Sequence, residues 1–293
     1  MSQLAVKTIR ANGLDFAYLE AGEGPLILLL HGFPDTAYGY QNVMSSLAAA
    51  GYRAVAPFMR GYAPSPLASD GDYSIPALGR DVLALIEHFG GGEKARVVGH
   101  DWGSIATQYA ANLRPDRFEK IVLCAVPQMR RFFLSLTPAQ IKRSHYIFRF
   151  QAPLWAEKRI PKNDFAWLRE VIFKRWSPGY DFSEEELAPL LEGFRDPARL
   201  KAALAYYRAI PATVADPRKA RIAFRAQTVP AMVIFGSDDG CIGPDMFTKQ
   251  EKRFKGGLKL VEKPGMGHFP QYEQPEWFAA QILEFLGNPA EQS

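Results

Sequence analysis

The sequence predicts an α/β protein built on one mostly parallel β-sheet and interrupted by a long helical insertion. In residues 1–127, and again in residues 229–293, short strand-like runs alternate with helix-like segments. This alternation is typical of a parallel sheet covered by helices on both faces. In residues 128–228 the alternation stops, and the sequence is helical and rich in aromatic residues. We therefore expect a core domain formed by the two outer ranges and a helical cap, or lid, formed by the middle one.

The bulk composition limits the class of protein. The 293 residues suit one α/β domain with an insertion, and the formal net charge of +4 is small, with no basic stripe that would indicate a nucleic-acid partner. The most apolar run, Leu26–Leu30, is too short to span a bilayer, and residues 1–4 lack the pattern of a signal peptide. These features favour the cytoplasm. Cys124 and Cys241 are expected to be reduced and buried.

The elements of the amino-terminal half follow from local signals. Asn12-Gly13 between two strand-like runs predicts a tight hairpin. The continuous apolar run Leu26–Leu30 predicts a strand buried on both faces. The remaining strands are expected at Ala5–Arg10, Asp15–Glu20, Tyr52–Pro57, Ala95–Gly99 and Lys120–Ala125, and helices at Tyr38–Ala50 and Ile75–Phe89.

Helix-start signals recur in the insertion. Thr137 with Gln140, and Ser183 with Glu186, predict capping boxes, in which two side chains reciprocally bind backbone N–H groups. Asp196 before a first-turn proline predicts another helix start. Six aromatic residues are expected to form the core of the cap, some of them lining an apolar pocket: Phe132, Phe133, Phe148, Trp155, Trp167 and Trp176. After the insertion we expect strands Ala231–Phe235 and Leu258–Glu262 and a helix near Pro275–Leu286.

The most informative motif is Gly99-His100-Asp101-Trp102-Gly103, which lies between a strand and a helix. Hydrolases usually carry a nucleophilic serine at the centre of such a strand-to-helix elbow. An aspartate is already ionised near neutral pH, since its ordinary pKa is about 4, so it needs no base to become a nucleophile. It would attack saturated carbon and form an alkyl-enzyme ester. Asp101 therefore points to epoxides or alkyl halides rather than to esters.

Two downstream motifs supply partners for this nucleophile. Asp238 and Asp239 follow one strand, and His268 lies in a glycine-rich loop after the last strand. Loops at the carboxyl ends of strands can bring such side chains together. We expect His268 to activate the water that splits the ester, and one of the two carboxylates to fix the histidine tautomer.

An oxyanion hole is expected where His31-Gly32-Phe33-Pro34 follows the buried strand. The backbone N–H groups of Phe33 and Trp102 are the candidate donors. His31 itself is expected to pack within its loop rather than to catalyse.

Together these motifs resemble those of the α/β-hydrolase-fold epoxide hydrolases, and the related haloalkane dehalogenases share most of them. The resemblance covers essentially the whole chain, including the cap. It implies an α/β-hydrolase fold and a reaction that needs water but neither a cofactor nor a metal. In that family's Gly-x-x-Asp register the acid is Asp239, with Asp238 as the alternative.

The leaving group separates the two reactions. An opening epoxide leaves an alkoxide, which requires an acid such as tyrosine, whereas a halide requires only N–H donors. Epoxide hydrolases carry two cap tyrosines in contexts that resemble those of Tyr146 and Tyr207, so the resemblance assigns them proton donation. Many haloalkane dehalogenases have asparagine in place of Phe33.

We therefore predict an epoxide hydrolase that converts a small apolar epoxide to a vicinal diol through an ester on Asp101. The alternatives are a haloalkane dehalogenase using the same triad, with the Trp102 indole on the halide, and a non-catalytic receptor of the same fold. The sequence leaves the physiological substrate, the stereochemical preference and the oligomeric state open, a homodimer included.

Overall fold

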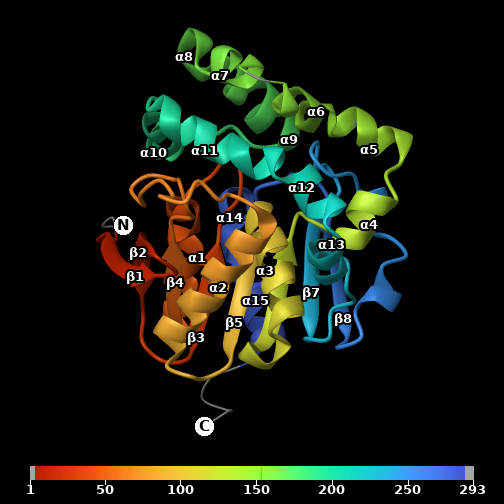
Figure 1. Cartoon of the computed structure of the whole chain (residues 1–293). Coiled ribbons are helices and arrows are strands. Elements are labelled where there is room, and N and C mark those ends of the chain that lie inside the picture. Colours follow the sequence, from red (N-terminus) through yellow and green to blue (C-terminus); the bar gives the residue numbers. More distant parts are fainter. Residues whose placement is uncertain (1–3, 153, 288–293) are drawn as a thin grey trace.

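The computed structural model describes residues 4–152 and 154–287. At its centre lies an eight-stranded sheet with the order β1-β2-β4-β3-β5-β6-β7-β8 (Figure 1). The two pairings made by β2 are antiparallel, and all the others are parallel. The strands are β1 Lys7–Ala11, β2 Leu14–Ala21, β3 Leu26–Leu30, β4 Arg53–Pro57, β5 Ala95–His100, β6 Phe118–Cys124, β7 Ala231–Gly236 and β8 Leu258–Lys263. The predicted mostly parallel sheet is confirmed.

Helices cover both faces of this sheet. Because side chains alternate along a strand, Leu28 and Val97 pack toward α2 and α3, whereas Ile27 and Val98 pack toward α1 and α15. Figure 1 shows α2 and α3 on the near face and α15 behind the sheet. These helices and the short α14 are α1 Gln41–Ala49, α2 Ile75–Gly90, α3 Trp102–Leu113, α14 Pro270–Glu273 and α15 Pro275–Leu286.

The helical insertion lies between β6 and β7, and Figure 1 shows α5 to α11 above one end of the sheet. Its last helix, α13, packs against α3 beside the sheet, where Asn112 Nδ2 donates to the carbonyl of Ile222. The insertion consists of α4 Met129–Leu134, α5 Pro138–Arg143, α6 His145–Gln151, α7 Trp155–Arg159, α8 Lys162–Trp167, the π-helical turn Leu168–Phe173, α9 Lys174–Trp176, α10 Glu184–Phe194, α11 Pro197–Arg208, α12 Ile210–Ala215 and α13 Pro217–Ala223.

The local signals differ in how well they predicted geometry. Asn12 and Gly13 both have positive φ, 43° and 78°, as a two-residue hairpin turn between β1 and β2 requires. The helix predicted at Tyr38–Ala50 is split, because a 3₁₀ turn at Ala37–Tyr40 precedes α1. Its cap is the Thr36 hydroxyl, which accepts from the N–H of Tyr38.

One of the two predicted capping boxes is wrong. Ser183 and Glu186 form a full box at the start of α10. At α5 the Thr137 hydroxyl accepts from the N–H of Gln140, but the Gln140 side chain does not reach back. Instead it binds the carbonyl of Cys241 and the N–H of Gly243, two polar groups in the buried interior. Tertiary contacts therefore override the local motif.

One predicted core aromatic is also wrong. Phe148 is 62% exposed, because α6 turns Tyr146 and Phe150 inward and leaves the residue between them outside. Phe132, Trp167 and Trp176 are buried as predicted. No helix of the described residues is long and apolar enough to cross a membrane.

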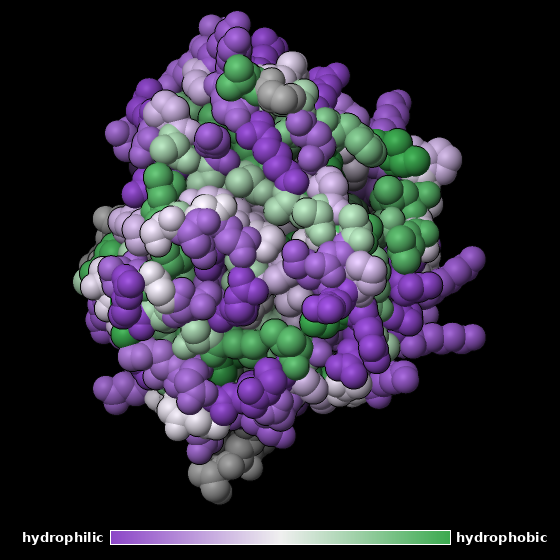
Figure 2. All heavy atoms as spheres, viewed as in Figure 1, coloured by the Kyte–Doolittle hydropathy of each residue, from purple (hydrophilic) through white to green (hydrophobic). Residues whose placement is uncertain are grey.

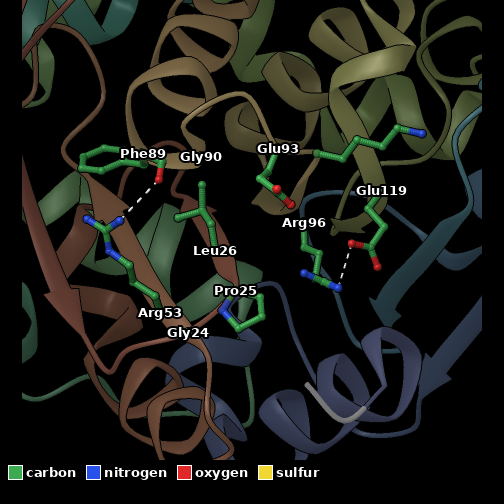
Figure 3. Close-up of a pocket in the computed structure, with 10 residues that line it drawn as sticks. Gly24, Pro25, Leu26, Arg53, Phe89, Gly90, Glu93, Arg96 and Glu119 are labelled. Atoms are coloured by element: carbon green, nitrogen blue, oxygen red, sulfur yellow. Dashed lines mark hydrogen bonds and ion pairs between the residues drawn. The ribbon is translucent and has the colours of Figure 1, made fainter. Parts of the chain in front are cut away.

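A surface groove of about 800 Å³ lies where the parallel strands begin (Figure 3). Two of its basic side chains are paired. Arg53 contacts Glu20 at 2.6 Å, and Arg96 contacts Glu119 at 2.7 Å. Because Asp101 follows the opposite, carboxyl end of β5, this groove lies away from the candidate nucleophile.

Candidate active site

Asp101 lies at the bend between β5 and α3, with φ 49° and ψ −116°. Such a backbone is strained for a residue other than glycine, and it persists only where the surroundings enforce it. Glycines on both sides permit the close packing. A Cβ on Gly99 would lie 2.4 Å from the carbonyl oxygen of Gly103, and a Cβ on Gly103 would lie 2.0 Å from that of Leu30. The predicted elbow is therefore present, and it holds the Asp101 carboxyl group at a fixed place.

The loop after β3 meets this carboxyl group. The N–H of Phe33 donates to Asp101 Oδ1 at 2.8 Å. Gly32 makes the approach possible, since a Cβ there would lie 2.5 Å from Oδ1 and 2.7 Å from the backbone nitrogen of Trp102. The N–H of Phe33 thus binds Oδ1, and the N–H of Trp102 lies near the same atom. Trp102 is also the first residue of α3, where the positive end of the helix dipole favours negative charge.

His268 lies between two carboxylates. Its Nδ1 is 2.8 Å from Asp239 Oδ2, and its Nε2 is 3.8 Å from Asp101 Oδ2. The other oxygen of Asp239 accepts the N–H groups of Cys241 and Ile242, at 2.7 and 3.0 Å. Asp238, in contrast, is exposed and accepts from the hydroxyl of its neighbour Ser237. The structure thus brings Asp239, and not Asp238, to the histidine.

The charges around His268 decide its protonation. Burial of the imidazole disfavours its charged form, but the negative charges of Asp239 and Asp101 outweigh burial and raise the pKa of His268 to about 10. Burial raises the pKa of Asp101, but the nearby imidazolium of His268 outweighs burial, so that the pKa is lowered overall. In the free protein the site therefore holds an imidazolium between two carboxylates.

Several residues that fix the His268 loop were missed by the sequence analysis. The N–H of His268 is shared between the carbonyl of Trp176 and the Ser177 hydroxyl, at 3.0 and 3.1 Å. Ser177 donates in turn to Glu273, which also accepts two backbone N–H groups of the loop, those of Gly267 and Phe269. The Trp176 ring lies 4.9 Å from the imidazole. No local pattern marks these residues, because the contacts join segments far apart in the sequence.

Another buried carboxyl group, Asp35, was also missed. It accepts from Tyr272 Oη at 2.7 Å and from Gln271 Nε2 at 2.9 Å. Burial raises its pKa to about 6. Gln271 also contacts His100 Nδ1, and His100 Nε2 lies 2.8 Å from the carbonyl oxygen of His268. Asp35 comes directly after the oxyanion loop in the sequence, and this position was the signal that could have identified it.

Tyr146 and Tyr207 come together from α6 and α11, with ring centroids 5.9 Å apart. Both line a cavity of about 20 Å³ that also reaches Asp101 and Trp102. Burial is the main cause that raises the pKa of both phenols well above its ordinary value, and the charge of Asp101 adds to it. Both hydroxyls therefore remain protonated. The cavity has room for about one water molecule, so a larger ligand requires the aromatic side chains to move.

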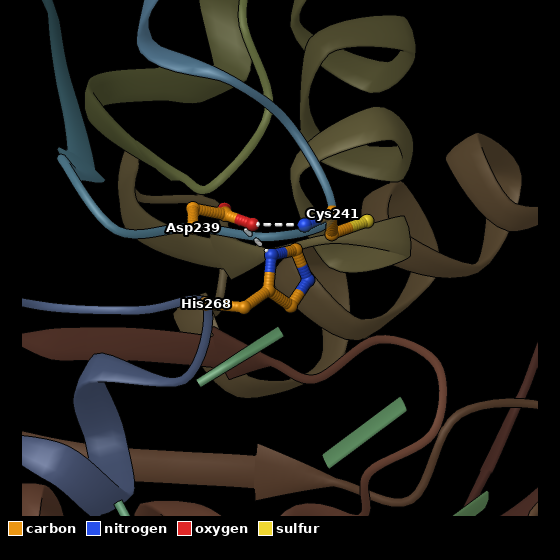
Figure 4. A group of neighbouring side chains, drawn as sticks. All are labelled: Asp239, Cys241 and His268. Carbon is orange, nitrogen blue, oxygen red and sulfur yellow. Dashed lines mark hydrogen bonds and ion pairs between the residues drawn. The ribbon is translucent and has the colours of Figure 1, made fainter. Parts of the chain in front are cut away.

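Cys241 is the nearest polar neighbour of Tyr146, with its sulfur 3.5 Å from the phenol oxygen. Burial and the charges of Asp239 and Asp101 raise the pKa of its thiol well above the ordinary value. Figure 4 shows Asp239, Cys241 and His268 together, and one donor atom of each lies within 4.8 Å of the others. These three could in principle ligate a metal ion. However, the carboxylate is already used by His268 and two N–H groups, and the thiol is protonated.

Three residues predicted to be buried or to pack within a loop are placed as expected. His31 is buried and links two loops, since its Nε2 accepts the N–H of Met59 at 3.0 Å. Burial lowers its pKa to about 4, so it stays neutral. Cys124 and Cys241 are both buried free thiols.

Comparison with known proteins agrees with this arrangement. Residues 25–275 match the family described as alpha/beta hydrolase fold. The chain belongs to the α/β-hydrolase fold family. It is 33% identical to the Bacillus subtilis (strain 168) AB hydrolase superfamily protein YfhM, over 98% of this chain and 100% of that protein. It is 30% identical to epoxide hydrolase A of Mycobacterium tuberculosis, over 96% of each.

Solved structures give the same result for this α/β hydrolase. The crystal structure of an epoxide hydrolase from Vigna radiata superposes with a TM-score of 0.83 at 27% identity, covering 98% of both chains. A mutant of the potato epoxide hydrolase superposes with a TM-score of 0.82 at 28% identity, covering 97% of this chain and 99% of that one. The predicted resemblance to α/β-hydrolase-fold epoxide hydrolases is confirmed.

Proposed function

We propose that this protein hydrolyses small apolar epoxides to vicinal diols through a covalent alkyl ester on Asp101. One observation carries the proposal. The Asp101 carboxylate lies between the Phe33 N–H and the His268 imidazole, and two buried phenols, Tyr146 and Tyr207, line the same cavity. The first two contacts suit any ester intermediate on this residue. The phenols add the acid that an epoxide needs.

Ring opening uses the oxygen of Asp101 that the oxyanion loop leaves free. Oδ2 forms a bond to an epoxide carbon as the carbon–oxygen bond breaks. Tyr146 and Tyr207 donate hydrogen bonds to the developing alkoxide, and one of them gives it a proton. Because the ester carries no charge, the pKa of His268 then falls, and the imidazolium can donate its proton to the phenolate. This step leaves a neutral imidazole facing the ester.

Hydrolysis follows with His268 as the base. The imidazole takes a proton from water, and the hydroxide attacks the Asp101 carbonyl carbon. The charge that develops on Oδ1 is stabilised by the N–H groups of Phe33 and Trp102. The diol oxygen leaves with the proton from His268, and the acid form of Asp101 restores the imidazolium. Asp239 keeps the ring in the required tautomer throughout.

The alternatives receive less support. A haloalkane dehalogenase would need N–H donors for the halide, and the Phe33 side chain supplies only a ring, packed 5.4 Å from that of Tyr207. The indole of Trp102 is the remaining donor for that reaction. A receptor without catalysis would not need His268 joined to both carboxylates. The cap above the sheet, which we propose as a separate lid domain, supplies both phenols.

A single turnover in heavy-oxygen water tests the covalent step. With enzyme in excess over styrene oxide, the diol of the first turnover should be unlabelled, because its new oxygen comes from Asp101. Label should appear in later turnovers. Label in the first diol would contradict the ester. Turnover of styrene oxide without bromide release from 1-bromobutane would separate the epoxide from the halide reaction, and the reverse pattern would overturn the proposal.

A further inference from the structure

The outer surface of the insertion carries apolar side chains that the proposed reaction does not use. Ten large apolar side chains of the described residues are exposed, and five of these lie between residues 134 and 154. Their exposed fractions range from 37% to 62%, and the residues are Leu134, Leu136, Ile141, Phe148 and Leu154. Figure 2 shows apolar residues gathered over the region where Figure 1 places α4 and α5.

Two of these side chains, Ile141 and Phe148, lie on the consecutive helices α5 and α6. Ile141 and Phe148 are seven residues apart, and only Ser144 separates the two helices. Both side chains are exposed, at 46% and 62%. Tyr146 and Phe150 occupy the inner face and are buried. The outer surface of α4 to α6 thus carries several exposed apolar side chains rather than an isolated one.

The sequence around these residues is strongly cationic. Residues 128–163 contain eight Lys and Arg against one acidic residue, although the net charge of the whole chain is only +4. Lys142 and Arg149 each follow one of the exposed apolar residues, and both are exposed. In the part of the chain that the structure describes, no ion pair involves the three exposed cations of α4 to α6, which are Arg130, Lys142 and Arg149.

We propose that this outer face of α4 to α6 binds the surface of an anionic phospholipid bilayer. Apolar side chains that enter the headgroup boundary and cations that contact anionic headgroups are the two contributions that hold a helix on a membrane surface. No described helix could span the bilayer, so the contact is peripheral. The proposal does not depend on the reaction proposed above.

Other occupants fit this surface less well. A symmetric dimer would place the same patch against itself, and unpaired cations would then face unpaired cations. A nucleic acid would satisfy the cations but would leave Ile141 and Phe148 against phosphate and water. The anionic bilayer satisfies both kinds of side chain.

The location has a functional consequence. Helix α6 carries Phe148 on its outer face and Tyr146 on its inner face, so the bound membrane would lie one helix away from the cavity. An apolar substrate dissolved in the bilayer would then need only a short path to the site.

Vesicle flotation tests the proposal on the full chain. Vesicles of phosphatidylserine and phosphatidylcholine should bind the protein at low salt, with binding lost in 1 M salt, where charges are screened beyond about 3 Å. Vesicles of phosphatidylcholine alone should bind it weakly. The variant Lys142→Ala/Arg149→Ala should weaken binding about 25-fold, from about fivefold per cation. Ile141→Ser/Phe148→Ser, which keeps all charges, should also weaken it.

The matched control is Lys255→Ala/Leu260→Ser, which removes an exposed lysine and an exposed leucine elsewhere. It should bind vesicles as the unaltered protein does, and all variants should keep its melting temperature. Equal vesicle binding by the Lys142/Arg149 variant and the control would overturn the proposal. Failure to bind phosphatidylserine vesicles at low salt, tighter binding to duplex DNA, or dimerisation lost in that variant would overturn it too.

Discussion

Substitution of Gly32 by alanine tests the oxyanion geometry directly. A Cβ at this position would lie 2.4 Å from Asp101 Cβ, 2.5 Å from Asp101 Oδ1 and 2.7 Å from the nitrogen of Trp102. These contacts are too short to persist, so the loop must move away from the nucleophile. The N–H of Phe33, now 2.8 Å from Oδ1, moves with it. Loss of one oxyanion donor typically lowers kcat by about 10²–10³-fold, or about 2.7–4 kcal/mol.

The two chemical steps should respond differently. Negative charge leaves the Asp101 carboxylate as the ester forms, and it returns to Oδ1 when water attacks. Loss of the Phe33 N–H should therefore slow hydrolysis of the ester and not its formation. Under excess styrene oxide, Gly32→Ala should accumulate the alkyl-enzyme, visible as a mass increase of the intact protein after rapid quenching.

Gly90→Ala is the matched control, because a Cβ there would have Leu26 Cδ2 as its nearest contact, at 3.9 Å. It should keep the rates of both steps. The reasoning would be refuted if Gly32→Ala folded with an unchanged melting temperature and hydrolysed the ester as fast as the unaltered protein. A slowed first step with normal ester hydrolysis would refute it equally.

Three further substitutions test the charges and the acid. Asp101→Asn removes a negative charge beside His268, so the imidazole pKa, about 10 in the unaltered protein, should fall, as measured by NMR titration. Because this folded-state pKa lies above the ordinary 6.5, the charged histidine stabilises the fold at low pH, and the contribution is lost as pH rises toward 10. Between pH 6.5 and about pH 10, the free energy of unfolding measured with urea should fall less in Asp101→Asn than in the unaltered protein. An unchanged titration of His268 would contradict the ion pair. Tyr207→Phe should slow ring opening by about 10²-fold or more in stopped-flow measurements, and an unchanged rate would remove this phenol from the mechanism. Asp239→Asn should lower kcat by about 10⁴-fold through the wrong tautomer, whereas the exposed Asp238→Asn should leave kcat unchanged; equal effects would show that neither orients the base.

Features that depend on short-range rules were predictable from the sequence. The Asn12-Gly13 turn, the elbow at Asp101 and the final helix Pro275–Leu286 each follow from a few adjacent residues, and the structure contains all three. The order of the motifs along the chain also predicted that Asp101 and His268 would meet, because the carboxyl ends of parallel strands share one edge of the sheet.

Features that depend on contacts between distant segments were not predictable. Gln140 leaves its expected cap for buried groups about a hundred residues away, and Glu273 holds the His268 loop through Ser177. Phe148 was expected in the core of the cap but is exposed, because an aromatic residue in a helix does not reveal which face the fold will bury. The space available between Tyr146 and Asp101 likewise depends on how the insertion sits on the sheet.

The protonated state of Cys241 bears on the durability of the protein. Epoxides alkylate sulfur readily, but the reactive species is the thiolate, and here burial and two neighbouring carboxylates keep the sulfur as a thiol. Asp101, whose charge acts on this thiol, has a lowered pKa and is the ionised group. In the proposed reaction, these surroundings direct the electrophile to Asp101, from which water can later release it, and spare Cys241 from permanent alkylation.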